Sequence, residues 1–94
     1  MRAMHPGRIL RRELNARSLS ANALALALRT PSGRITDILN EKRAVSVETA
    51  MRLGRYFGQS PRFWLNLQMI YDLKLAEEAV GAAIDSQVAP ARAS

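Results

Sequence analysis

The residues best suited to chemistry in this chain are polar side chains that recur along residues 32–40. On a helix, Ile35, Ile38 and Leu39 stand at i, i+3 and i+4 and share one apolar side. The mostly polar remainder consists of Ser32, Gly33, Arg34, Thr36, Asp37 and Asn40. Such a helix would anchor itself on a neighbour and turn a hydrogen-bonding surface outward. The chemistry that this pattern predicts is recognition rather than catalysis.

Two short helices joined by a tight turn are predicted to position this surface, over Leu19–Arg43. Ser20 is a natural N-cap for the first helix, which is rich in Ala and Leu and buries Leu24, Ala25 and Leu28. We expect Thr30 to cap the second helix and Pro31 to be its first residue. This arrangement describes a helix-turn-helix unit, whose second helix enters a DNA major groove.

Further helices are predicted on both sides of this unit, over Pro6–Ala16, Val47–Phe57 and Arg62 to about Ala79. Local signals for their ends are His5 and Pro6, Ser46, Gly58, and Ser60 with Pro61. No strand-like alternation is present, so the predicted fold class is all-α. We expect one domain over residues 1–80, with the helix-turn-helix at about 20–40 and the long C-terminal helix at about 61–79. Residues 81–94 lack a periodic face and are predicted to form a flexible tail.

The predicted last helix is apolar around most of its circumference. Trp64, Leu67 and Tyr71 are expected to serve the core or a dimer interface. A helix that is apolar nearly all round has to be covered on more than one side. A second copy of the chain is the simplest cover, because two-fold dimers predominate among homo-oligomers. The alternative is a single deep core that leaves a few apolar side chains exposed.

Charge is distributed unevenly along the chain. Residues 1–62 hold twelve Lys or Arg against four Asp or Glu, whereas residues 63–94 hold two against four. The net charges of the two parts are therefore +8 and −2, which together make the +6 of the chain. A basic first part indicates a surface for a polyanion, although a basic solvated surface is the alternative. Arginine outnumbers lysine twelve to two, which suits bidentate contacts with phosphate or guanine.

Composition excludes several classes of protein. The chain has no cysteine and one histidine, so neither a thiolate metal site nor a nucleophile–base pair can be assembled convincingly. The eight acidic residues are scattered, no Gly-rich phosphate loop is present, and we expect no enzyme activity, metal or cofactor. No apolar run approaches the roughly 18 residues that a membrane span requires. We expect a cytoplasmic protein without membrane contact.

The motifs HPGRIL, LSANALA, RITDILNEKR and TAMRLGRYFGQSPRFWLNLQMIYDL resemble the HigA-type antitoxins, which belong to the wider group of helix-turn-helix repressors that includes the phage repressors. The resemblance runs from His5 to about Ala76. It implies a five-helix bundle of the lambda-repressor type, dimeric through its C-terminal part. It also implies two partners, the operator DNA of the protein's own operon and a HigB-type toxin, a ribosome-dependent mRNA endonuclease that the antitoxin neutralises.

The resemblance assigns Ser32, Gly33, Thr36 and Asp37 to groove-facing positions, Arg34 to a phosphate or guanine, and Asn40, Lys42 and Arg43 to the DNA backbone. The chain departs from the family at Ala21, a position often held by Gln, which leaves only backbone N–H groups for a phosphate. Arg29 and Glu41 stand where Gly is common, and Gly33 offers no side chain.

These departures predict weaker sequence readout, with affinity depending on arginines and DNA shape. Two alternatives to the antitoxin and autorepressor are a solitary repressor without a toxin and a toxin-inhibiting module with weak DNA binding.

Overall fold

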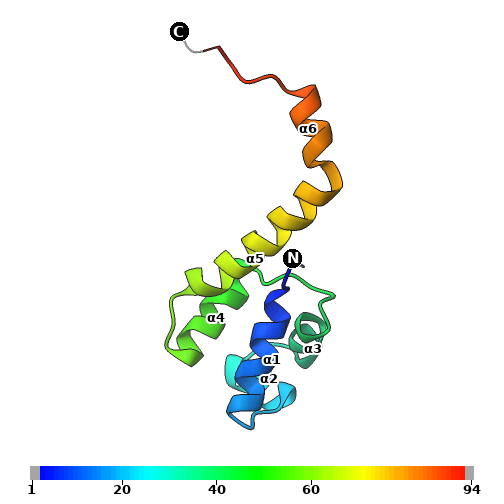
Figure 1. Ribbon diagram of the computed structural model, residues 1–94. Coiled ribbons are helices and arrows are strands. Elements are labelled where there is room, and N and C mark those ends of the chain that lie inside the picture. The colour runs from blue at the N-terminus through cyan, green and yellow to red at the C-terminus, as the bar shows by residue number, and fades with distance from the viewer. Residues whose placement is uncertain (1–2, 93–94) are drawn as a thin grey trace.

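The computed structural model describes residues 3–92, which form six α-helices and one π-helical turn (Figure 1). In chain order they are α1 Pro6–Ala16, α2 Ala21–Leu28, α3 Ser32–Leu39, α4 Val47–Phe57, α5 Pro61–Ala76, the π-helical turn η1 Glu77–Gly81, and α6 Ala82–Gln87. Helices α1–α5 pack together as the predicted all-α, five-helix bundle. Together η1 and α6 continue α5 as an arm that comprises Glu77–Gln87.

Local capping explains most of the helix ends. The hydroxyl oxygens of Ser20, Ser46 and Ser60 accept hydrogen bonds from backbone N–H groups in the first turns of α2, α4 and α5, at 3.0, 3.2 and 3.1 Å. Gly58 ends α4 with a φ of 73°, a left-handed conformation that glycine adopts without a steric penalty. These ends agree with the sequence prediction.

The predicted start of α3 is wrong by one residue. Pro31 occupies the N-cap position with extended backbone, and Ser32 is the first helical residue. The hydroxyl of Thr30 does not cap the helix; it accepts a hydrogen bond from Arg34 at 3.5 Å. Since Pro31 has no N–H and a fixed φ, it fits either position, and the tertiary contacts of the turn decide between them.

The core lies where α1, α2, α3, α4 and α5 meet. Its completely buried members are Leu10, Leu24, Ile35, Ile38, Ala50, Leu53 and Trp64. The indole N–H of Trp64 donates to the side-chain oxygen of Gln59 at 2.9 Å, so this aromatic ring is buried without an unpaired polar atom. The core therefore holds both helices of the predicted DNA-binding unit rigidly against three others.

Two glycines allow the helices to approach this closely. A Cβ on Gly7 in α1 would overlap the backbone carbonyl of Ile38 in α3. A Cβ on Gly54 in α4 would lie 2.6 Å from the carbonyl oxygen of Gln59 and 3.1 Å from the nitrogen of Pro61. Glycine at these positions thus sets the spacing between α1 and α3 and the tightness of the α4–α5 turn.

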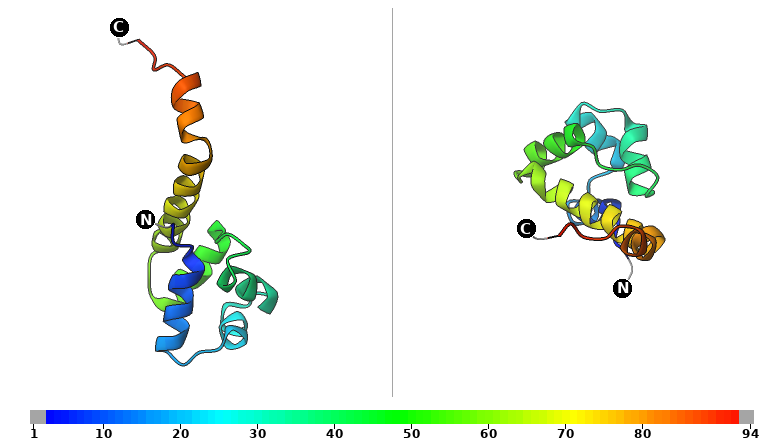
Figure 2. Two further views of the ribbon diagram at one scale, coloured as in Figure 1. Left: turned by 45° about the vertical axis from the view of Figure 1, so that its right-hand side comes forward. Right: turned by 90° about the horizontal axis from the view of Figure 1, so that it is seen from above.

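The last helix extends further than the sequence predicts. In place of an end near Ala79, the helix passes through η1 and continues to Gln87. Alanine-rich sequence favours helix, and no proline lies between Pro61 and Pro90, which explains the extension. The arm leaves the bundle and gives the molecule its long dimension of 54 Å against 26 and 22 Å (Figure 2). Flexibility of the tail stays a prediction.

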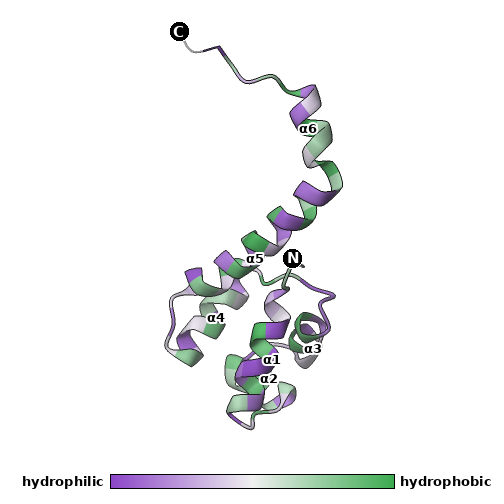
Figure 3. Cartoon of the chain, in the orientation of Figure 1, coloured by the Kyte–Doolittle hydropathy of each residue, from purple (hydrophilic) through white to green (hydrophobic). Residues whose placement is uncertain are grey.

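Large apolar side chains are exposed along α5 and the arm. Figure 3 shows that hydrophobic and hydrophilic residues alternate along this part of the chain. Among them are Met69, Ile70 and Leu73 on α5 and Val80, Ile84 and Val88 on or just after the arm, with exposed fractions between 46 and 62%. In the single chain, the last helix therefore has apolar side chains that the core does not cover, as the sequence predicts.

Candidate nucleic-acid interface

Helix α3 lies on the surface of the bundle with its two sides clearly separated. Ile35 and Ile38 are fully buried and Leu39 is 8% exposed, so the apolar side faces the core. Ser32, Gly33, Thr36 and Asn40 are exposed, and Asp37 is half-buried. The structure thus brings these five predicted residues together on one outward surface. We call this surface the α3 face.

Hydrogen bonds within the helix orient part of the α3 face. The hydroxyl of Thr36 donates to the backbone carbonyl of Ser32 at 3.1 Å, so the oxygen of this exposed side chain can still accept a hydrogen bond. No atom lies within 4 Å of the position that a Cβ on Gly33 would take, so this part of the helix surface is flat and open. The backbone of α3 can therefore approach another molecule closely here.

The loop after α3 folds back onto the end of the helix and carries cations beside it. Glu41 has a φ of 62°, and its N–H donates to Ile38 at 3.0 Å. The N–H of Lys42 donates to the carbonyl of Asp37 at 2.8 Å, and the guanidinium of Arg43 lies 3.9 Å from the carboxylate of Asp37. Lys42 and Arg43 are exposed beside the α3 face, where a phosphate backbone would pass.

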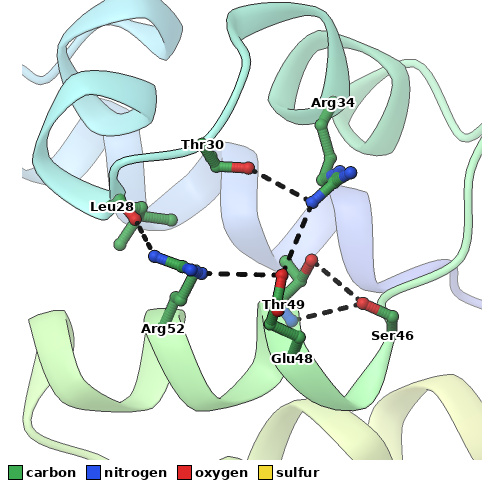
Figure 4. A network of polar contacts seen from close by, with 7 residues as sticks. All are labelled: Leu28, Thr30, Arg34, Ser46, Glu48, Thr49 and Arg52. Carbon is green, nitrogen blue, oxygen red and sulfur yellow. Dashed lines mark hydrogen bonds and ion pairs between the residues drawn. The ribbon is translucent and has the colours of Figure 1, made fainter.

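Arg34 departs from the prediction that it points outward to DNA. It is half-buried, and its guanidinium turns toward α4, where it donates to the hydroxyl of Thr30 at 3.5 Å and lies 3.9 Å from Glu48 (Figure 4). The free helix offers two directions for this long side chain, and the carboxylate of Glu48 selects the inner one. Arg34 holds α3 against α4, and its contact with DNA stays a prediction.

The same network fixes the turn between α2 and α3. The guanidinium of Arg52 in α4 donates to the backbone carbonyl of Leu28 at 2.8 Å and lies 3.8 Å from Glu48 (Figure 4). This bond satisfies a carbonyl at the C-terminal end of α2, where the helix leaves such groups unpaired. Arg29 then reverses the chain with a φ of 58°. The family's preference for glycine at this position and at Glu41 has its physical reason in these left-handed conformations.

His5 caps the N-terminus of α1, whose first turn lies against Ile38 near the C-terminal end of α3. Its Nδ1 accepts a hydrogen bond from the N–H of Gly7 at 2.9 Å, and its ring meets Tyr71 of α5 edge-on at 4.8 Å. Burial lowers the pKa of His5 below its ordinary value of 6.5, while the nearby charges of Glu41 and Asp72 and a backbone hydrogen bond with Arg43 act in the raising direction. His5 is a cap, as the sequence predicts.

The N-terminus of α2 contains a polar residue that sequence reasoning missed. Ala21, the predicted backbone contact, is half-buried as the first residue of α2. Asn22 follows it and is exposed, with a side-chain amide at the helix end where the family often has Gln one position earlier. An exposed amide in the first turn of an otherwise Ala- and Leu-rich helix was the available signal.

The three residues predicted to serve the core or the dimer have different environments. Trp64 belongs wholly to the core, between the rings of Phe57 and Phe63 at 6.2 and 5.1 Å. Leu67 is partly buried against the core cluster, and Tyr71 is half-buried beside His5. The exposed apolar surface of α5 lies instead at Met69, Ile70 and Leu73.

The sequence model of the helix-turn-helix family matches residues 10–64, which run from α1 into the beginning of α5. The chain belongs to the helix-turn-helix family. Over 79 residues it is 52% identical to virulence-associated protein I of Dichelobacter nodosus, a match that covers 83% of this chain and 73% of that protein. The helix-turn-helix unit of the family corresponds here to α2, the turn at Arg29, and α3.

Solved structures of antitoxins resemble the whole chain. A HigA-family addiction module antidote protein from Coxiella burnetii is 47% identical, with a TM-score of 0.93, and the match covers 97% of this chain and 100% of that chain. The antitoxin HigA of Pseudomonas aeruginosa, solved with the higBA promoter, is 43% identical with the same TM-score and the same two coverages. The resemblance to HigA-type antitoxins is thereby confirmed.

No helix in residues 3–92 combines the length and the apolar character needed to cross a bilayer.

Proposed function

We propose that this protein is an antitoxin and transcriptional autorepressor. As a homodimer it binds the operator of its own operon, and it neutralises a HigB-type toxin that cleaves mRNA. The observation that carries the proposal is the α3 face, whose hydrogen-bonding groups point outward while Ile35 and Ile38 anchor the helix in the core. The similarity of the chain to the HigA antitoxin of Pseudomonas aeruginosa, solved with the higBA promoter, supports operator DNA as a partner. Its similarity to a HigA-family addiction module antidote protein supports the toxin as a partner.

The proposed mechanism is occlusion of a promoter by two α3 helices in successive major grooves, about 34 Å apart. Ser32 and Thr36 offer groups for base edges, and Asp37 can accept from a cytosine amino group. Gly33 lets the helix backbone come close to the DNA. The backbone contacts that we propose come from Asn40, Lys42, Arg43, and the N-terminus of α2 with Ala21 and Asn22.

Because the α3 face has short side chains and a glycine, we propose that phosphate contacts and DNA shape supply much of the affinity. Arg34 would join them only by leaving Glu48 and Thr30. The protein acts by occupying DNA and toxin, without catalysis, metal or cofactor, and its place of action is the cytoplasm.

Fluorescence anisotropy with the DNA upstream of the gene, compared with a scrambled duplex of equal length, tests the repressor function. We expect preferential binding by the wild type, and loss of that preference in the Ser32→Ala, Thr36→Val double variant. Asn15→Ala, at an exposed polar residue of α1 outside the α3 face, is the control and should bind like the wild type. Equal affinity of the wild type for both duplexes would contradict the operator function.

Co-expression with the HigB-type toxin encoded beside the gene tests neutralisation. We expect growth to be restored by the wild type and by the Ser32→Ala, Thr36→Val variant alike. Rescue without any operator preference would favour a toxin-inhibiting module. Operator preference without a neighbouring toxin gene would favour a solitary repressor.

A further inference from the structure

An open groove of about 750 Å³ lies between the C-terminal end of α2 and the outer side of α4. Residues that line it include Ala27, Arg29, Met51, Arg52, Arg55 and Tyr56. The groove shares no residue with the α3 face. Met51 and Tyr56 are 56 and 43% exposed there, so apolar surface lies open between arginines.

The groove is positively charged. Its one carboxylate, Glu48, is compensated by Arg34 and Arg52 at 3.9 and 3.8 Å. Arg29 and Arg55 make no ion pair within residues 3–92. An occupant should therefore carry negative charge beside an apolar stripe, which suits a polypeptide better than a DNA backbone that offers no apolar surface.

The arm has this complementary chemistry. Val80 and Ile84 in the arm and Val88 directly after it recur every four residues, with exposed fractions of 46, 50 and 62%. Glu77, Glu78 and Asp85 are exposed on the same segment, and none of them forms an ion pair in the part of the chain that the structure describes. Within its own chain α6 packs mainly against η1, and the arm points away from its own groove (Figures 1 and 2).

The exposed apolar surface of α5 connects this arm to a second copy. If two α5 helices pair antiparallel through Met69, Ile70 and Leu73, each arm passes the N-terminal end of the partner's α5. The tight α4–α5 turn at 58–60 places the C-terminal end of α4, with Arg55 and Tyr56, at that position. An arm of 11 helical residues is about 17 Å long, enough to run along the outer side of α4.

We propose that, in the homodimer, the arm of each protomer lies in the α2–α4 groove of its partner. The inference rests on the dimer of the proposed function. In this arrangement Ile84 of one protomer contacts Met51 of its partner. On either side of this apolar contact, acidic side chains of the arm lie near arginines of the groove.

Cysteine cross-linking of the full chain tests the placement directly, because the protein has no cysteine of its own. We expect the Met51→Cys, Ile84→Cys variant to form a covalent dimer under mild oxidation, visible on a non-reducing gel. Arg12→Cys with Ile84→Cys is the matched control, since Arg12 is exposed on α1 and outside the groove. A control that cross-links as completely as the groove pair would overturn the placement.

Charge reversal provides a second readout by sedimentation equilibrium. We expect Arg55→Glu and Asp85→Arg each to raise the dimer dissociation constant about tenfold, with most of the affinity recovered in the double variant. Arg12→Glu should leave the dissociation constant unchanged.

The outcomes separate this inference from the proposed function. A wild-type dimer whose dissociation constant is the same in Arg55→Glu overturns the inference alone. A variant that keeps the dimer but loses affinity for the toxin or for operator DNA also overturns it, since another molecule then occupies the groove. A wild type that is monomeric at micromolar concentration contradicts the proposed dimer itself.

Discussion

Replacing Gly7 by alanine tests how tightly α1 must approach α3. A Cβ at this position would lie 3.0 Å from the carbonyl carbon of Ile38 and closer still to the carbonyl oxygen. The atoms that it meets belong to the backbone of α3, so no side-chain rotation relieves the overlap. Either α1 or α3 has to move.

The size of the effect follows from two opposing contributions. Overpacking a well-packed site costs about 1–3 kcal/mol, and an immobile backbone neighbour places Gly7 near the upper limit. Because alanine has the higher helix propensity, replacing a helical glycine by alanine stabilises the helix by at most about 1 kcal/mol. We expect a net loss of about 2 kcal/mol in the free energy of unfolding. For a domain of this size that corresponds to a melting temperature lower by about 8–16 °C.

Gly33→Ala is the matched control, because it makes the same substitution in a helix where nothing lies within 4 Å. We expect it to leave stability unchanged or raise it by up to about 1 kcal/mol. Thermal and urea unfolding followed by circular dichroism measure both variants, at one fixed protomer concentration because the proposed dimer would contribute to stability. A Gly7→Ala protein that melts at or above the wild type would refute the reasoning, as would equal shifts in the two variants.

Three further perturbations probe the turn, the cap and the interface. Arg29→Gly should exceed Arg29→Ala in unfolding free energy by about 1 kcal/mol, since only glycine relieves the left-handed φ; equal urea midpoints would contradict this. Burial lowers the pKa of His5 below 6.5, so as the pH falls the imidazole is protonated in the unfolded chain before it is protonated in the folded protein. The contribution of His5 to stability should therefore not change with pH above about pH 6.5, and stability should fall as the pH drops from there toward the lower folded pKa. His5→Asn keeps a capping oxygen and should remove that dependence below about pH 6.5, as pH-dependent melting would reveal. Lys42→Ala should reduce the slope of log affinity against log salt by about one; an unchanged slope would place the phosphate contact elsewhere.

Sequence reasoning succeeded where the deciding interactions are local. Ser20, Ser46 and Ser60 cap helices by bonding to residues two or three positions ahead, and Gly58 stops α4 by its own backbone conformation. These events depend on neighbouring residues alone, so the pattern of residue types is sufficient. The predicted end of the last helix near Ala79 was wrong, because the weakly periodic, alanine-rich segment that follows can be helical without a buried face.

The close approach at Gly7 could not be read from the chain, since Ile38 is distant in sequence and its carbonyl becomes a neighbour only when α1 crosses α3. Asn22 is a similar case, as its exposure depends on how α2 is oriented in the bundle.

The sequence by itself determined that residues 32–39 form an amphipathic helix, because the spacing of Ile35, Ile38 and Leu39 requires one buried side. Only the tertiary structure decided which polar residues of that helix remain available. Thr36 and Asn40 stay exposed, whereas Arg34 is drawn inward by Glu48 of a different helix. A long charged side chain takes its direction from the nearest opposite charge, and that charge is positioned by the packing of α4 rather than by the order of residues in α3.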